Sequence, residues 1–184
     1  MRRLFLASAV LLACSATAVS ASVNRAEKTA GTHSFSSVAR AALGGELLTY
    51  ERATWRWERV MGASPTQTAG RVLAAMSLPD VQRAVGLWRS RADAAYRRAE
   101  RPPHRSEWLC IHRYEGSWTD TGAPYYGGLQ MNLTFQQRYG RWLFRHKGTA
   151  DHWTPLEQMW TAEKALKSRG FWPWPNTARS CGLL

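Results

Sequence analysis

Apolar residues recur at helical spacing in the middle of the chain, at positions i, i+4, i+7 and i+11. These positions are Val81, Val85, Trp88 and Ala92. Ser77 followed by Asp80 is typical of a helix start, and Pro102-Pro103 marks the end. The arginines interspersed between the apolar positions favour a solvated outer face. The spacing predicts an amphipathic helix here, within a helical segment over 47–103.

Two further helices are indicated closer to the C-terminus. One begins at Ser106, which can cap it, and ends at Gly116. One of its faces carries Trp108, Ile111, His112 and Glu115. The other helix begins with the capping box Thr154-Pro155-Leu156-Glu157 and ends at Gly170. Its apolar stripe predicts core packing, with Glu163 as a buried partner for a basic residue.

The N-terminus has the pattern of an export signal. Two arginines precede an apolar run over 4–13, and Val19-Ser20-Ala21 offers the small residues that signal peptidase requires. We expect a signal peptide over 1–21 and, because Ser, Ala, Thr and Gly dominate the next stretch, a flexible linker over 22–46. The apolar run is shorter than the roughly 20 residues that span a bilayer, so no transmembrane segment is predicted. Leu11-Leu12-Ala13-Cys14 resembles a lipobox, which leaves a lipid anchor at Cys14 as an alternative.

Composition and charge narrow the class of protein. A chain of 184 residues suits one domain with a modest extra segment, and 45% hydrophobic with 21% charged residues exclude a disordered or fibrous chain. Lysine and arginine total 25 against 13 acids, and the formal charge of +12 favours an anionic partner such as a cell-wall polymer, a membrane surface or nucleic acid. Ten tryptophans supply flat faces that stack on sugars or bases as readily as they fill a core.

Cysteine usage agrees with export. Cys14 lies in the expected leader, so the mature chain keeps an even pair, Cys110 and Cys181. In an oxidising compartment such a pair is expected to form a disulfide, the alternative being two buried free thiols.

Glu115 is the main candidate for chemistry. It falls in the last turn of a predicted helix, where the negative end of the helix dipole raises the pKa of a carboxyl group, and Trp108 and Trp118 are expected to desolvate it further. A carboxylic acid that keeps its proton near neutral pH is what glycosidic cleavage requires, because the leaving oxygen must be protonated as the bond breaks. Taken alone, the residue would be interpreted as an ordinary surface glutamate.

The residues that follow Glu115 resemble those of a known family. The run 108–114 is followed by Glu115-Gly116-Ser117-Trp118 and, after a turn, by Tyr125-Tyr126-Gly127-Gly128-Leu129-Gln130. This pattern resembles the resuscitation-promoting factor and transglycosylase-like domains of the lysozyme superfamily, which are exported enzymes of actinobacteria. The resemblance covers roughly 104–184. It implies a mainly α (α+β) lysozyme-like domain with a small β-hairpin, preceded here by the helical segment of unassigned role.

The resemblance also implies roles for single residues. Glu115 would be the catalytic acid, Gln130 would lie in the sugar groove, and Tyr125 or Tyr126 would line it. With Trp118 and Asn132 these residues form the expected substrate-binding set. Relatives often carry a cysteine directly before the glutamate, where this chain has Tyr114, and an acid after the Gln-aromatic segment, where it has Asn132. The second departure removes the most convenient second carboxylate.

The expected function is cleavage of the β-1,4 bond between N-acetylmuramic acid and N-acetylglucosamine in peptidoglycan. A lytic transglycosylase needs one carboxyl group, because the substrate's own 6-hydroxyl completes the reaction. A hydrolytic muramidase normally uses two carboxylates roughly 5 to 10 Å apart, for which Asp120 is the candidate, although its position in a turn is the simpler interpretation. A cell-wall-binding protein without catalysis is the alternative from another class.

No cofactor or metal is predicted, because the spacing of His146, Asp151 and His152 matches no familiar zinc motif. The segment 171–175 is expected either to extend the sugar groove or to pack around Cys181. We expect a monomer that is secreted or retained at the cell wall. Its partners would be peptidoglycan glycan strands and anionic wall polymers, and nucleic acid is not expected.

Overall fold

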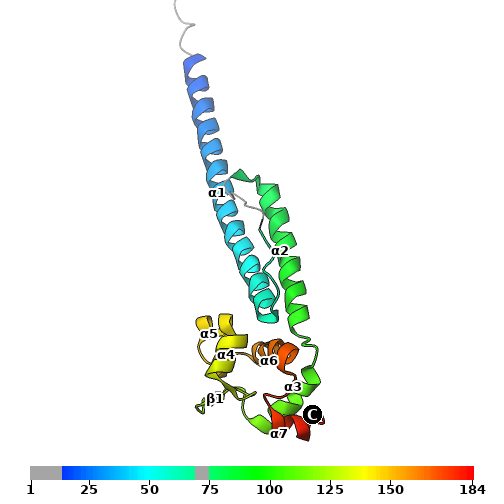
Figure 1. Ribbon diagram of the computed structural model, residues 1–184. Helices are drawn as coiled ribbons and strands as arrows, with labels where there is room; N and C mark the ends of the chain where they lie inside the picture. The colour runs from blue at the N-terminus through cyan, green and yellow to red at the C-terminus, as the bar shows by residue number, and fades with distance from the viewer. Residues whose placement is uncertain (1–13, 69–74) are drawn as a thin grey trace, which may run out of the picture.

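The computed structural model describes residues 14–68 and 75–184, and the side chains of α1 from Ser37 onward (Figure 1). The helix α1 (Cys14–Met61) lies beside α2 (Leu78–Ala99), and the other elements gather at one end of this pair. They are α3 (Arg105–Glu115), β1 (Tyr125–Tyr126), β2 (Met131–Asn132), α4 (Leu133–Tyr139), α5 (Arg141–Lys147), the 3₁₀ turn η2 (Ala150–His152), α6 (Pro155–Arg169) and α7 (Pro175–Ser180). The two strands pair antiparallel. The predicted fold class, mainly α with a small hairpin, is confirmed.

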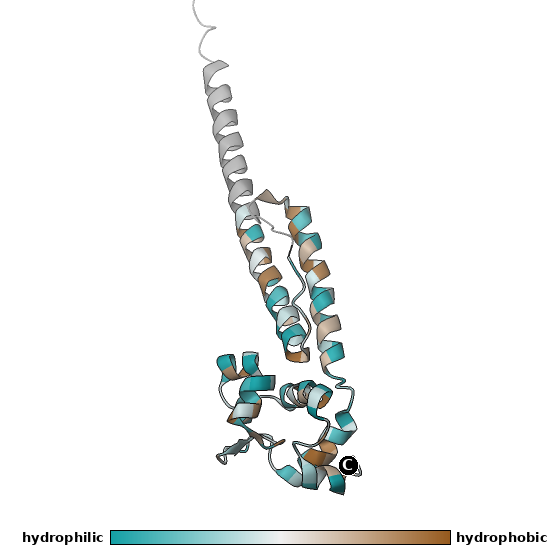
Figure 2. Ribbon diagram, viewed as in Figure 1, coloured by the Kyte–Doolittle hydropathy of each residue, from teal (hydrophilic) through white to brown (hydrophobic). Residues whose placement is uncertain are grey.

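The pair of α1 and α2 carries its own apolar cluster. Apolar and polar residues are interleaved along α2 (Figure 2), and the predicted apolar face is buried. The cluster consists of Leu47, Ala84, Val85 and Trp88. Trp55 of α1 meets the ring of Trp88 edge-on at a centroid distance of 6.0 Å. The predicted start of α2 is confirmed, because the Ser77 side chain accepts a hydrogen bond from the backbone N–H of Asp80.

Residues 22–46, expected to form a flexible linker, lie within helix α1 instead. The later part of this stretch has partners: Leu43 packs against the apolar cluster, and Glu46 forms an ion pair with Arg89 of α2. Of the expected signal peptide, residues 1–13 lie outside the described residues, and its cleavage and the lipid anchor stay predictions. Among the described residues, no helix has the length and apolar character needed to cross a bilayer.

The helix pair joins the rest of the molecule through buried contacts. Trp57 and Val60 of α1 belong to the main apolar core, which also contains Trp108 and Met159. The indole N–H of Trp160 donates to the carbonyl oxygen of Ala99 at the end of α2, at 2.7 Å. The segment 47–103 therefore shares its core with 104–184.

The ends of α3 and α6 differ in how well the sequence indicates them. The capping box of α6 between Thr154 and Glu157 is present as predicted. Helix α3 begins at Arg105 rather than being capped by Ser106, and the carboxylate of Glu163 accepts the backbone N–H of His104 at 2.8 Å. Glu163 is buried, and His104 is the basic partner expected for it. A side chain from a distant helix thus replaces the local cap.

Cys110 of α3 and Cys181, which follows α7, form a disulfide, as predicted. The bond links residues 71 positions apart in the sequence. In the chain-entropy description, closing a loop of this length stabilises the folded state by about 4 kcal/mol. It therefore ties α7 to the helix that carries Glu115.

Candidate functional site

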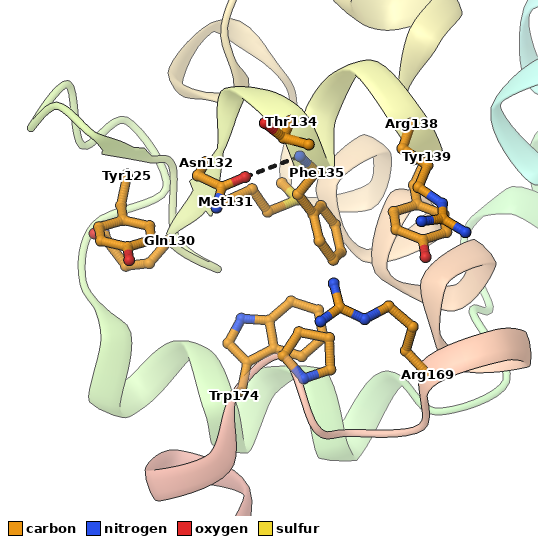
Figure 3. Close-up of a pocket in the computed structure, with 11 residues that line it drawn as sticks. Tyr125, Gln130, Met131, Asn132, Thr134, Phe135, Arg138, Tyr139, Arg169 and Trp174 are labelled. Atoms are coloured by element: carbon orange, nitrogen blue, oxygen red, sulfur yellow. Dashed lines mark hydrogen bonds between the residues drawn. The ribbon is translucent and has the colours of Figure 1, made fainter.

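A groove of about 240 Å³ opens between the β-hairpin with α4 on one side and the segment joining α6 to α7 on the other (Figure 3). Its lining residues are Tyr125, Gln130, Met131, Asn132, Thr134, Phe135, Arg138, Tyr139, Arg169, Pro173 and Trp174. The aromatic rings supply flat apolar walls, and the amide and guanidinium groups supply polar ones. Such a lining suits a sugar ring, which presents C–H faces and a rim of hydroxyl groups.

Three of the residues expected in the groove line it: Tyr125, Gln130 and Asn132. Tyr125 is 48% exposed, so its ring is free to meet a ligand. The Asn132 side chain also caps α4, because its oxygen accepts the backbone N–H of Phe135 at 2.9 Å (dashed in Figure 3). Asn132 therefore shapes the groove by starting α4 as well as by lining it.

The other two expected substrate-binding residues, Trp118 and Tyr126, do not line this groove. Trp118 stacks on His112 with ring centroids 3.9 Å apart, and its backbone carbonyl accepts a hydrogen bond from Gln158 at 2.8 Å. Tyr126 packs against the main apolar core. Both side chains thus hold the hairpin segment against α3 and α6.

The glycines of the Tyr-Tyr-Gly-Gly segment allow close packing of protein against protein. A Cβ atom at Gly127 would lie 2.5 Å from the side-chain oxygen of Gln158, and one at Gly128 would lie 2.6 Å from Nδ1 of His112. The structure places α6 and α3 there, because the backbone N–H of Gly128 donates to Gln158 and His112 bonds to the Gly128 carbonyl.

Gln130 is the most constrained residue of the groove. Its φ of 47° lies in the left-handed region, which side chains other than glycine rarely adopt. Its amide nitrogen donates to the carboxylate of Asp120 at 2.7 Å and to the carbonyl of Gly127 at 3.0 Å. Because both partners only accept hydrogen bonds, they fix the orientation of the amide. The Oε1 atom of Gln130 is left as the acceptor for a ligand hydroxyl.

Asp120 acts in a turn and as the support of Gln130. One carboxylate oxygen accepts the backbone N–H of Gly122 at 2.9 Å, and the other accepts from Gln130. Asp120 therefore has the contacts of a turn residue, the simpler of the two interpretations offered by the sequence.

Glu115 lies half-buried at the C-terminal end of α3. Its Oε1 accepts a hydrogen bond from the hydroxyl of Thr177 in α7 at 2.8 Å. A Cβ atom at the next residue, Gly116, would lie 3.5 Å from the amide nitrogen of Gln130. Glu115 is not among the residues that line the groove. Its connections to the groove are indirect: Thr177 belongs to α7, whose N-cap is the groove residue Trp174, and Gly116 adjoins Gln130.

The tryptophans expected around Glu115 have other partners. Trp108 is fully buried and donates its indole N–H to Glu163 at 2.9 Å, and Trp118 stacks on His112. The residue that holds the Glu115 carboxyl group is instead a hydroxyl, Thr177, which comes from a distant segment and carries no local signal in the sequence.

The groove is electropositive. Arg138 and Arg169 line it, and no Asp or Glu is among its lining residues. In Figure 3 the guanidinium group of Arg169 points between Phe135 and Trp174. Neither arginine belongs to a sequence motif, and they lie on different helices, α4 and α6, so no pattern along the chain indicates that they meet.

The segment 171–175 lies partly in the lining of the groove and partly in the main core. Pro173 and Trp174 line the groove, and Trp174 is buried, donating its indole N–H to the carbonyl of Leu129 at 2.7 Å. Trp172 is 62% exposed.

The three residues of the weak metal pattern are engaged separately. Nδ1 of His146 bonds to the carbonyl of Trp142 at 2.8 Å, and Asp151 pairs with His152 at 3.0 Å. Within the described residues, no group of three His, Cys, Asp or Glu side chains is placed to hold a metal ion.

Comparisons of this chain with protein-family models, with curated proteins and with solved structures found no match. The resemblance drawn from the sequence therefore rests on the residues from Trp108 to Gln130.

Proposed function

We propose that this protein cleaves the β-1,4 glycosidic bond of peptidoglycan between N-acetylmuramic acid and N-acetylglucosamine. The observation that carries the proposal is the Glu115 carboxyl group, which Thr177 of α7 holds at the end of α3. Gly116, the next residue, adjoins Gln130, which lines an aromatic and cationic groove. A sugar strand lying in the groove would present a glycosidic oxygen to this carboxyl group at the groove's end. The disulfide agrees with an exported protein, and we place its activity outside the cell or in the cell wall.

The proposed mechanism is that of a lytic transglycosylase. Glu115 donates its proton to the glycosidic oxygen as the bond to C1 of the muramic acid breaks. The resulting carboxylate then takes the proton of the 6-hydroxyl group, which attacks C1 and closes a 1,6-anhydro ring. The same carboxyl group gives one proton and receives one, so it ends the cycle as it began.

The contacts of Asp120 favour this mechanism over a two-carboxylate muramidase. Both of its oxygens are engaged, one by the turn and the other by Gln130, and the groove lining contains no Asp or Glu. A second carboxylate that activates water therefore has no candidate among the lining residues.

Mass analysis of muropeptides released from purified peptidoglycan tests the proposal. We expect the wild type to release anhydro-muropeptides and Glu115→Gln to release none, because an amide has no acidic proton to donate. Glu107→Gln, on the first turn of the same helix, is the matched control and should retain activity.

Two other outcomes would indicate a different function. Products with reducing ends that depend on Glu115 would identify a hydrolytic muramidase. If peptidoglycan stays undigested, and the wild type and Glu115→Gln bind it equally, the protein is a non-catalytic wall-binding protein.

A further inference from the structure

A second hollow of about 610 Å³ adjoins the groove across helix α4. It is lined by Thr134, Gln137, Arg138, Arg141, Phe144 and Arg145. Thr134 and Arg138 line both hollows, so the two form one continuous track from the groove over α4 to α5. Like the groove, this second hollow has no Asp or Glu in its lining.

Four arginines follow this track: Arg169, Arg138, Arg141 and Arg145. All four are exposed, and none makes an ion pair with an acid of the described residues. Neighbouring cations on a helix, such as Arg141 and Arg145 at i and i+4, repel each other and weaken the helix. An array of unpaired cations in a concave surface is therefore suited to an anionic ligand.

The arginines are held in a fixed relation to the groove. Gly140 joins α4 to α5 directly, and a Cβ atom there would lie too close to a carbon of the Trp153 ring for any side chain to fit, so the corner packs tightly against the core. Lys147 at the end of α5 is engaged by Glu157 at 2.7 Å and does not belong to the array. The guanidinium groups of α4 and α5 are thus displayed from a rigid corner.

We propose that this arginine track binds the carboxylates of the stem peptides on the strand that occupies the groove. The inference rests on the proposed function, and it names the part of the substrate that the track recognises. In peptidoglycan the peptides project from the glycan at every muramic acid and carry free carboxylates. A strand lying in the groove would send such a peptide over α4, and a guanidinium group binds a carboxylate through two parallel hydrogen bonds.

The test measures binding with the full chain carrying Glu115→Gln, so that cleavage does not interfere. Two ligands are compared: glycan strands with their stem peptides, and the same strands stripped of peptides by an amidase. We expect binding to peptide-bearing strands to be about tenfold tighter, since hydrogen bonds to charged groups carry the preference. The preference should vanish when Arg141→Ala and Arg145→Ala are added.

The matched control adds Arg97→Ala and Arg98→Ala, which remove the same charge from exposed positions of α2. The preference should survive there. If the Arg97/Arg98 and Arg141/Arg145 double replacements lose the preference equally, net charge alone explains binding and the inference is overturned. It is also overturned if the Glu115→Gln protein binds strands with and without stem peptides equally well. Lys replacements at 141 and 145 should keep only part of the preference, since an ammonium group lacks the planar fork.

Phosphate is the other anion of cell walls, and the same variants distinguish it. If Arg141→Ala and Arg145→Ala weaken binding to a phosphate-bearing wall polymer but leave binding to peptide-bearing strands unchanged, the assignment to carboxylates is overturned. The proposed function is judged separately by the anhydro products of the wild type. If those form while the peptide preference is absent, only the arginine inference fails.

Discussion

Gln130 combines a backbone conformation that costs free energy with a side chain whose orientation is fixed by two acceptors. A left-handed residue other than glycine is kept only where its surroundings impose it. Here Asp120 and Gly127 hold the amide nitrogen, and under the proposed function Oε1 would accept a hydrogen bond from a sugar hydroxyl. Asp120 is therefore a positioning residue, acting through Gln130.

Replacing Asp120 by Asn tests this role. The new amide keeps an oxygen for the Gly122 N–H but turns an N–H₂ group toward the N–H₂ of Gln130, so one of the two hydrogen bonds must be lost. We expect KM for glycan strands to rise about tenfold, the scale of one hydrogen bond to a charged group, with kcat changed much less.

Thr121→Ala, an exposed change in the same turn, is the control and should leave KM unaltered. A fall in kcat with constant KM would contradict the positioning role of Asp120, since it would show an interaction made only in the transition state.

The site residues found from the sequence all come from one stretch, the residues from Glu115 to Asn132. Their motif is local, so a pattern reveals it. Thr177, Arg138 and Arg169 meet them only because α4, α6 and α7 fold back onto the hairpin. No spacing along the chain encodes that meeting. The sequence likewise could not show that Trp118 stacks on His112 instead of covering Glu115.

At the scale of elements, one buried carboxylate connects three helices. Glu157 at the start of α6 receives Arg56 of α1 at 2.8 Å and Lys147 of α5 at 2.7 Å, and it closes the capping box with Thr154. Burial alone would raise the pKa of Glu157, but the hydrogen bonds from Lys147 and Arg56 and from the Thr154 backbone outweigh it and lower the pKa below the ordinary value.

Glu157 therefore stabilises the fold in a pH-dependent way. Its pKa is lower in the folded than in the unfolded protein, so the stabilisation is fully present above the ordinary value of 4.5 and is lost as the pH falls through the folded value. We expect Glu157→Gln to lower the free energy of unfolding by about 3 kcal/mol at pH 7, because two cations lose their partner. Urea unfolding curves at several pH values measure this.

The difference between wild type and Glu157→Gln should shrink as the pH falls from 4.5 toward the lowered pKa of the folded protein, because in this range the unfolded wild type binds a proton that the folded protein does not. Asp93→Asn, an exposed change on α2, should alter stability by less than about 0.5 kcal/mol at any pH. A difference that stays constant down to low pH would show that shape rather than charge makes Glu157 important.

Some helices could be predicted from the sequence and others could not, for a physical reason. The ends of α2 and α6 carry their own signals, Ser77 and the Thr154 capping box, and were predicted. The short helices α4 and α5 were not predicted, because seven residues each are too few to be stable alone and depend on packing. Gly140, against Trp153, is part of that packing. The linker over 22–46 was expected from composition alone. Composition does not reveal that α2 supplies partners for Leu43 and Glu46, which lie in helix α1.

At the scale of the whole molecule, the helix pair and the C-terminal domain share one core. The sequence divides them at Pro102-Pro103, and the boundary there was expected to separate a segment of unassigned role from the catalytic domain. Trp57 makes contacts across that boundary: it is 8% exposed and belongs to the main core, together with Trp108 and Met159 from the other side. The α1–α2 pair therefore acts as a structural part of the domain.

This arrangement predicts that the two parts unfold together. In guanidinium chloride, helix content and tryptophan fluorescence of the wild type should change in one transition. Trp57→Ala should lower the free energy of unfolding by about 3 to 5 kcal/mol, because a large buried side chain leaves a cavity, and should separate the transition into two as α1 loses its hold on the core. Trp172→Ala, at 62% exposure, is the matched control and should change little. Two transitions already in the wild type would instead mean that 104–184 folds without the helix pair, and the shared core would then contribute little to the groove.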